Sequence, residues 1–237
     1  MKILYSLFIA VFLISFSIVA QEKQVLVFSE TQGFRHSSIP TGIKTIQELG
    51  DENGFKVDTT ENSATFLKDI QKYNVIIFLN TTGDVFTENE QEAFQKYIES
   101  GGSFFGIHAA TDTEYDWQWY GELAGAYFVS HPQIQNAEIH VEMPSHPTVE
   151  HLPEVWQRED EWYNFKQLNP ENEVLLSLDE TSYKGGENGN FHPIAWFREL
   201  DSGGRVIYTG GGHTKESYAN PAFRQHLLKS ILFAMGK

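Results

Sequence analysis

The sequence of 237 residues predicts an α/β fold: a doubly wound, mostly parallel sheet with helices on both faces and a loop-rich insertion. Short continuous runs at residues 24–30, 75–79 and 103–107, mainly apolar, are typical of strands that are buried on both faces. Segments with helix start and stop signals separate these runs. This strict alternation of strand and helix indicates parallel strands joined by right-handed crossovers.

The first part of the chain contains the alternating elements. We expect a strand at 24–30, a helix at 39–53, a strand at 55–59, a short helix at 64–72 and a strand at 75–79. Pro40 lies in the first turn of the first helix, and Gly54 ends that helix. Thr87 and Glu90 have the spacing of a capping box, which begins a further helix.

A strand at 103–107 is expected at the centre of the sheet. Gly101 and Gly102 end the preceding helix, and the strand ends on His108, which small residues follow. In open α/β sheets, ligands bind just beyond the carboxyl ends of the strands. A turn of small residues would let the backbone approach a ligand and leave the His108 side chain exposed at the strand end. The alternative is that His108 only forms hydrogen bonds within a tight turn.

Beyond this strand the alternation stops. We expect a short aromatic helix and turn at 117–128, strands at 137–142 and 174–178, a flexible turn at 184–190, strands at 194–197 and 205–209, and a last helix at 220–234. The material between the second-half strands is predicted to be rich in loops.

The composition limits the class of partner. The formal net charge of −15 argues against nucleic acid and anionic lipid, since both require basic patches. It fits a soluble protein that acts on a neutral or cationic small molecule. The chain contains no cysteine, which excludes disulfides, thiol catalysis and thiolate metal ligands.

Residues 1–20 are predicted to be a cleaved signal peptide. Lys2 precedes an almost wholly apolar run at 3–19, and Ala20 is a small residue suited to the cleavage site. The run is shorter than the ~20 apolar residues that a membrane span requires. We therefore expect a single exported domain over 21–237, periplasmic or extracellular and free of the membrane after cleavage. An uncleaved anchor is the alternative.

Polar side chains gather at four predicted strand ends. The groups are Glu30, Arg35 and His36; Asp84; His108, Asp112 and Glu114; and His213. If the strands are neighbours, these side chains meet at one edge of the sheet. We predict catalytic roles for His36, Asp84, His108 and His213, and substrate contacts for Glu30, Arg35, Asp112 and Glu114. The alternative for each residue alone is an ordinary hydrogen bond in a loop.

A divalent metal ion, Zn²⁺ or Mn²⁺, is a further possibility. The sequence has no His-Glu-x-x-His motif and no short histidine pair, so ligands would come from separate loops. His36, His108 and His213, together with an acid, are the candidate ligands. Acid–base catalysis without a metal stays open.

Two segments, 112–120 and 160–164, combine carboxylates with aromatic rings, which suits the recognition of a carbohydrate. They add Trp119, Tyr120, Glu161 and Trp162 to the predicted substrate contacts. The alternative is a solvated acidic rim with the tryptophans in the core.

Proline follows three histidines and holds each in an extended conformation. We add His131 and His192 to the predicted substrate contacts, while His146 and His151 are expected to be ordinary loop residues.

Several short motifs together resemble the ThuA-like, or trehalose utilisation, domain family. They are Gly33-Phe34-Arg35-His36, Thr82-Gly83-Asp84, Gly106-Ile107-His108-Ala109-Ala110, Trp119-Tyr120-Gly121, His131-Pro132, Asp160-Glu161-Trp162-Tyr163, His192-Pro193-Ile194-Ala195-Trp196 and Gly212-His213-Thr214. The resemblance covers nearly all of the chain after residue 20. It implies a flavodoxin-like fold related to the class I glutamine amidotransferases.

In that superfamily a cysteine lies at a strand-to-helix elbow and a histidine follows a later strand. The resemblance places His108 at or beside the elbow and His213 at the later position. Without a cysteine the amidotransferase reaction cannot take place. ThuA-like proteins are associated with sugar utilisation, often near oxidoreductases that make 3-keto sugars.

We therefore expect an exported enzyme that acts on a glycoside or keto-sugar by hydrolysis, elimination or isomerisation. The first alternative is a non-catalytic carbohydrate-binding protein on a degenerate amidotransferase fold. A second is a structural or partner-docking role, which would require an exposed apolar patch.

Overall fold

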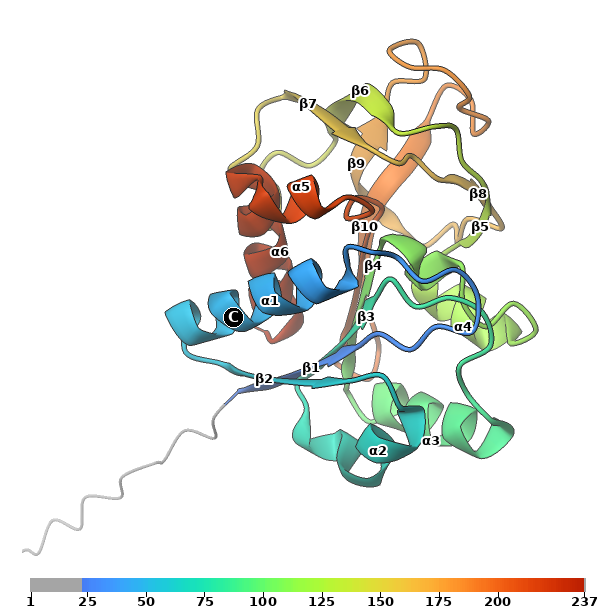
Figure 1. Cartoon of the computed structure of the whole chain (residues 1–237), viewed down its shortest axis with the longest axis vertical. Coiled ribbons are helices and arrows are strands. Elements are labelled where there is room, and N and C mark those ends of the chain that lie inside the picture. Colours follow the sequence, from blue (N-terminus) through green and yellow to red (C-terminus); the bar gives the residue numbers. More distant parts are fainter. Residues whose placement is uncertain (1–22, 237) are drawn as a thin grey trace, which may run out of the picture.

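The computed structural model describes residues 23–236, and nine strands in this range form one mixed sheet (Figure 1). The strands are β1 (Gln24–Phe28), β2 (Lys56–Thr60), β3 (Val75–Leu79), β4 (Ser103–Ile107), β6 (Gln135–Val141), β7 (Val155–Asp160), β9 (Glu173–Leu178), β10 (His192–Glu199) and β11 (Arg205–Thr209). Their order across the sheet is β2-β1-β3-β4-β11-β10-β9-β6-β7.

The sheet has a parallel half and an antiparallel half. Strands β2, β1, β3, β4 and β11 pair in parallel, whereas β11, β10, β9, β6 and β7 pair antiparallel. The chain runs from β1 outward to β2 and then returns to β3 on the other side of β1. Such a reversal between β1 and β3 is a topological switch point, where ligands commonly bind in open α/β sheets.

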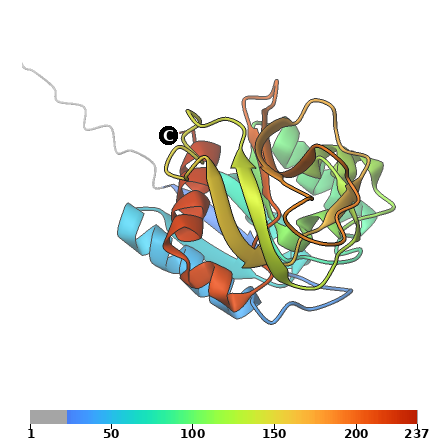
Figure 2. The same ribbon diagram turned by 90° about the horizontal axis from the view of Figure 1, so that it is seen from above.

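Helices cover both faces of the sheet, as predicted. They are α1 (Ile39–Asn53), α2 (Ser63–Phe66), α3 (Glu88–Glu99), α4 (Gln118–Ala124), α5 (Lys215–Ala219) and α6 (Pro221–Ala234), with 3₁₀ turns η1 (Leu67–Lys72) and η2 (His108–Thr111). Helices α1 and α6 lie on one side of the sheet and α3 and α4 on the other (Figures 1 and 2). The α/β, doubly wound fold class is thus confirmed, with a parallel core.

The parallel strands form the centre of the hydrophobic core. All five residues of β3 are fully buried, which explains their unbroken apolar sequence. The ring of Phe78 packs between those of Phe28 and Phe104, with centroid distances of 5.1 and 5.2 Å. Each fully buried side chain of this size stabilises the fold by about 1.5–3 kcal/mol.

The loop-rich prediction for the second half missed three strands. Residues 155–160 form β7, and β5 (Tyr127–Ser130) pairs with β8 (Asn164–Lys166) in a small separate sheet. In β7, exposed and buried residues alternate strictly, but two of the three buried residues are Arg158 and Asp160. Charged residues on the buried face hide the period-two apolar pattern by which a strand is recognised.

The predicted signal peptide, residues 1–20, lies outside the described residues, so cleavage and export stay predictions. Within residues 23–236, no helix combines the length and apolar character that crossing a membrane requires.

Buried His226 in α6 gives a testable pH dependence of stability. Its Nδ1 lies 2.9 Å from the Thr148 carbonyl oxygen, and burial lowers its pKa to about 4. The unfolded chain takes up this proton near pH 6.5, so lowering the pH from 6.5 to 4 favours unfolding by up to about 1.4 kcal/mol per pH unit.

In His226→Asn the amide can donate the same hydrogen bond but does not titrate. We expect the unfolding free energy of this variant, measured in urea at pH 7, 5.5 and 4.5, to fall less steeply than that of the wild type. The other histidines are present in both proteins, so their contributions to the pH dependence of the unfolding free energy cancel in the comparison. Parallel curves for the two proteins would contradict the assignment.

Candidate functional site

His108 lies at a sharp turn between β4 and η2. Its φ of 50° is in the left-handed region, which is strained for a residue with a side chain. A Cβ on Gly106 would lie 3.1 Å from the Cβ of Ala110, so the close approach favours a glycine at 106 and a small residue at 110. The prediction of an exposed side chain was wrong, because His108 is 0% exposed. The tight turn directs the imidazole inward instead of toward solvent.

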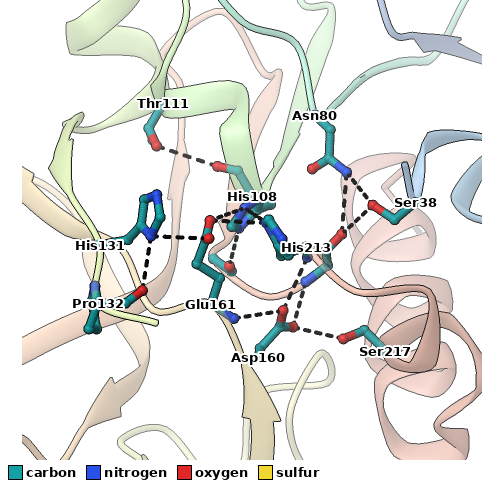
Figure 3. A network of polar contacts seen from close by, with 12 residues as sticks. Ser38, Asn80, His108, Thr111, His131, Pro132, Asp160, Glu161, His213 and Ser217 are labelled. Carbon is teal, nitrogen blue, oxygen red and sulfur yellow. Dashed lines mark hydrogen bonds and ion pairs between the residues drawn. The ribbon is translucent and has the colours of Figure 1, made fainter. Parts of the chain in front are cut away.

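Four side chains meet at this turn: His36, His108, Glu161 and His213. We call them the histidine–glutamate cluster. They follow β1, β4, β7 and β11, respectively, and one ligand atom from each lies within 4.8 Å of the others. The Glu161 Oε2 atom is 3.0 Å from His213 Nδ1 and 3.4 Å from His108 Nε2 (Figure 3). The structure thus brings together the three histidines of the predicted metal site.

The hydrogen bond of His108 fixes its tautomer. Its Nδ1 lies 2.9 Å from the Gly210 carbonyl oxygen, which can only accept a hydrogen bond. Nδ1 therefore carries the proton, and the lone pair of Nε2 faces His213 Nδ1 at 3.2 Å. A histidine held in this way by its other nitrogen is typical of a metal ligand.

His36 completes the cluster from the side. Its ring centroid is 5.0 Å from that of His108 and 5.0 Å from that of His213. Within the described residues its Nδ1 is buried without a hydrogen-bond partner. Such an atom is costly to bury unless something binds there.

The electrostatics suit a cation. Burial, reinforced by the neighbouring His108 and His213, lowers the pKa of His36 to about 3. Burial acts to raise the pKa of Glu161, but interactions with the same two histidines outweigh it and hold this pKa well below its usual range. At neutral pH His36 is uncharged and Glu161 is ionised, which are the protonation states that metal binding requires.

His131 lies at the solvent side of the cluster. Its Nδ1 is 3.1 Å from Glu161 Oε1, and its side chain is 42% exposed (Figure 3). The structure therefore brings this predicted substrate contact next to the cluster. His213 is the most exposed of the four cluster residues, with 20% of its side chain accessible.

Four predicted site residues form no hydrogen bond or ion pair with the cluster in the part of the chain that the structure describes. Arg35 forms an exposed ion pair with Glu61, and Glu30 accepts a hydrogen bond from the Ser63 backbone. Asp84 is exposed and, among the described residues, makes no hydrogen bond or ion pair with the cluster. Half-buried Asp112 accepts a hydrogen bond of 2.7 Å from the Tyr115 hydroxyl, and burial raises its pKa.

Glu114 has a structural role. It is 1% exposed, and its carboxylate accepts hydrogen bonds from the backbones of Val85 and Phe86 and from the Gln91 side chain. These bonds fix the segment that leads into α3. The prediction that Glu114 contacts substrate is contradicted, because the whole carboxylate is occupied within the protein.

Three further predicted substrate contacts lie in the interior. Tyr120, Trp162 and His192 are 0%, 1% and 0% exposed, and each forms a hydrogen bond to a backbone carbonyl oxygen. Trp119 is half-buried and stacks on Trp117 at 4.9 Å. Tyr120, Trp162 and His192, which are fully buried, cannot reach a sugar, so the aromatic residues at these positions indicated the core.

The sequence analysis assigned no role to Arg158 and named Asp160 only as part of the segment 160–164, although Asp160 contacts two residues of the cluster. Asp160 accepts hydrogen bonds from the backbones of Glu161 and His213, and Arg158 forms a buried ion pair with it. The sequence signal for the strand that carries them was the alternation in 155–160, which its charged residues disguise.

Replacing Tyr120 by Phe tests its placement in the core. The hydroxyl donates a buried hydrogen bond of 2.7 Å to the Ala110 carbonyl oxygen, so we expect Tyr120→Phe to lower the unfolding free energy by about 1 kcal/mol. Metal and sugar binding should not change. A weakened sugar affinity with unchanged stability in urea unfolding would restore Tyr120 as a substrate contact.

Comparison with protein families gives one match. The family model described as ThuA, trehalose utilisation, matches residues 24–234. A comparison with curated proteins gives no match.

Solved structures of two similar proteins share the fold. A ThuA-like protein from Bacteroides uniformis has a TM-score of 0.75 at 24% identity, over 92% of this chain and 94% of its own. A ThuA-like protein from Parabacteroides merdae has a TM-score of 0.75 at 16% identity, over 91% of each chain.

A more distant structure shares the overall fold. The glutaminase domain of Trypanosoma brucei CTPS, solved with bound acivicin, has a TM-score of 0.52 at 8% identity. The match covers 90% of this chain and 94% of that one. The predicted relation to the amidotransferase fold is therefore confirmed at the level of the fold.

Proposed function

Because this chain belongs to the ThuA, trehalose utilisation, family, we propose that it is an exported enzyme that acts on a glycoside or keto-sugar with a bound divalent metal ion. The family description gives the relation to sugars. The metal ion is proposed on the basis of the histidine–glutamate cluster, whose four ligand atoms lie within 4.8 Å of one another.

The donor set fits Zn²⁺ or Mn²⁺. Imidazole nitrogens and a carboxylate oxygen bind Zn²⁺ at about 2.0–2.2 Å, so two ligands of one ion lie at most about 4.4 Å apart. The cluster needs only a small contraction to reach this geometry. Adding Glu161 changes the predicted ligand set from three histidines and an unnamed acid to four named residues.

A bound ion would supply Lewis-acid polarisation of a carbonyl or hydroxyl oxygen of the sugar. His131 is placed to exchange a proton with substrate, since it is partly exposed and 3.1 Å from the carboxylate of Glu161. Hydrolysis, elimination and isomerisation of a sugar all need such a group. Asp112, whose pKa is raised by burial, is a second candidate for this proton transfer. It interacts electrostatically with His108 and His131.

The surface beside the cluster suits a sugar ring. Phe34 is 66% exposed, and its ring lies edge-on to His36 at a centroid distance of 4.9 Å. The Thr82 hydroxyl donates a hydrogen bond of 3.0 Å to the Phe34 carbonyl oxygen and so holds this residue in place. An apolar face next to a few converging polar groups is typical of small-molecule sites.

Metal analysis tests the proposal. We expect the protein, stripped with a chelator, reloaded with Zn²⁺ or Mn²⁺ and desalted, to retain about one ion per chain by plasma mass spectrometry. His108→Ala removes a ligand and should lose the ion. His140→Ala, at a half-buried histidine of β6 outside the cluster, is the matched control and should keep it. No retained ion in the wild type would contradict the metal assignment.

Turnover is tested separately, on a panel of glycosides and keto-sugars followed by mass spectrometry. The loaded wild type should give a product and folded His108→Ala should give none. Sugar binding by calorimetry without product from any compound would instead support the non-catalytic carbohydrate-binding alternative.

A further inference from the structure

The ion pair between Arg158 and Asp160 is almost completely buried. Arg158 Nη2 lies 2.6 Å from Asp160 Oδ2, and the two side chains are 5% and 0% exposed. A buried ion pair adds little net stability, because removing both charges from water costs about as much as their attraction returns. Its presence in β7, next to Glu161 in the sequence, therefore calls for another explanation.

Both oxygens of Asp160 are fully occupied by donors. Oδ1 accepts hydrogen bonds from the backbones of Glu161 and His213, at 3.0 and 3.2 Å. Oδ2 accepts from the Gly212 backbone and the Ser217 hydroxyl, each at 2.8 Å, in addition to Arg158 (Figure 3). One carboxylate thus joins the end of β7 to the loop after β11.

The glycines of that loop let the ion pair approach it closely. A Cβ on Gly211 would lie 2.9 Å from Arg158 Nη1, and Gly212 has a φ of 115°. A Cβ on Gly212 would also lie 2.9 Å from the Tyr218 hydroxyl. The run of three glycines at 210–212 therefore allows the loop to pack directly on Arg158 and Tyr218.

This loop in turn positions the cluster. The Gly210 carbonyl oxygen accepts a hydrogen bond from His108 Nδ1, and the His213 backbone N–H donates a hydrogen bond to Asp160. The Gly212 carbonyl oxygen accepts a hydrogen bond from Ser38, two residues after His36. Glu161 and His213 are thus tied to Asp160 directly and His108 through this loop, while the segment that carries His36 is tied to the loop through Ser38.

We propose that Arg158 and Asp160 are positioning residues that hold the four cluster side chains in a metal-binding geometry and so set the affinity for the ion. The proposal rests on the proposed function, since it presupposes that the cluster binds a metal. It differs from a purely structural role, in which the pair would stabilise the fold without affecting the site.

Asp160→Asn tests the proposal. The asparagine keeps the size of the side chain but replaces one acceptor oxygen by an NH₂ group that faces other donors. We expect the affinity for Zn²⁺, measured at pH 7 against a chromophoric chelator, to fall by about 10–100-fold, as for other groups that orient metal ligands. The visible absorption spectrum of the Co²⁺-loaded protein should change as well, because the ligand geometry changes.

Two further variants keep the test decisive. Ser217→Ala removes one donor to Asp160 and should weaken the affinity by a smaller factor while the protein stays folded. Arg198→Met is the matched control: Arg198 is a buried arginine that binds the Glu122 and Leu123 carbonyl oxygens, away from the cluster. It should destabilise the fold and leave the Zn²⁺ affinity and the Co²⁺ spectrum unchanged.

The outcomes separate the two proposals. If the wild type binds no metal, the proposed function fails. If the wild type binds and folded Asp160→Asn binds equally well with the same Co²⁺ spectrum, the positioning role is overturned. If Asp160→Asn does not fold, Ser217→Ala decides, and an unchanged affinity and spectrum there overturn the positioning role.

Discussion

The site depends on one electrostatic constraint: electron-rich atoms that face one another in the interior need a hydrogen-bonding proton or a cation between them. The carboxylate of Glu161, a lone pair of His108 and the nearest nitrogen of His213 lie 3.0–3.4 Å apart, and the ring centroid of buried His36 lies 5.0 Å from those of both other histidines. Either a proton or a metal ion satisfies this arrangement. The low pKa of His36 leaves this side chain uncharged at neutral pH, the state in which an imidazole binds a metal ion.

The two halves of the sheet contribute different parts of this site. The parallel half brings the ends of β1, β4 and β11 to one edge and so supplies the three histidines. The antiparallel half supplies Glu161 and the ion pair at the end of β7. The site therefore joins residues from both halves of the sheet, and the acid comes from the antiparallel half.

The sequence predicted the parts of the protein that follow regular patterns. Buried strands such as β3 have continuous apolar residues, and strand ends in a parallel sheet must meet, which located His36, His108 and His213. Glu161 was predicted only as a substrate contact and not as a metal ligand. The charged residues on the buried face of β7 concealed the strand that brings Glu161 to the histidines. Tyr120, Trp162 and His192 were misassigned because burial of an aromatic or histidine side chain leaves no mark in composition.

The most direct test of the central claim is anomalous diffraction from crystals of the Zn²⁺-loaded protein, recorded on both sides of the zinc absorption edge. The account predicts one strong peak bonded to His36, His108, Glu161 and His213 at about 2.0–2.2 Å. A peak at other residues, or none in crystals shown to contain zinc, would contradict it.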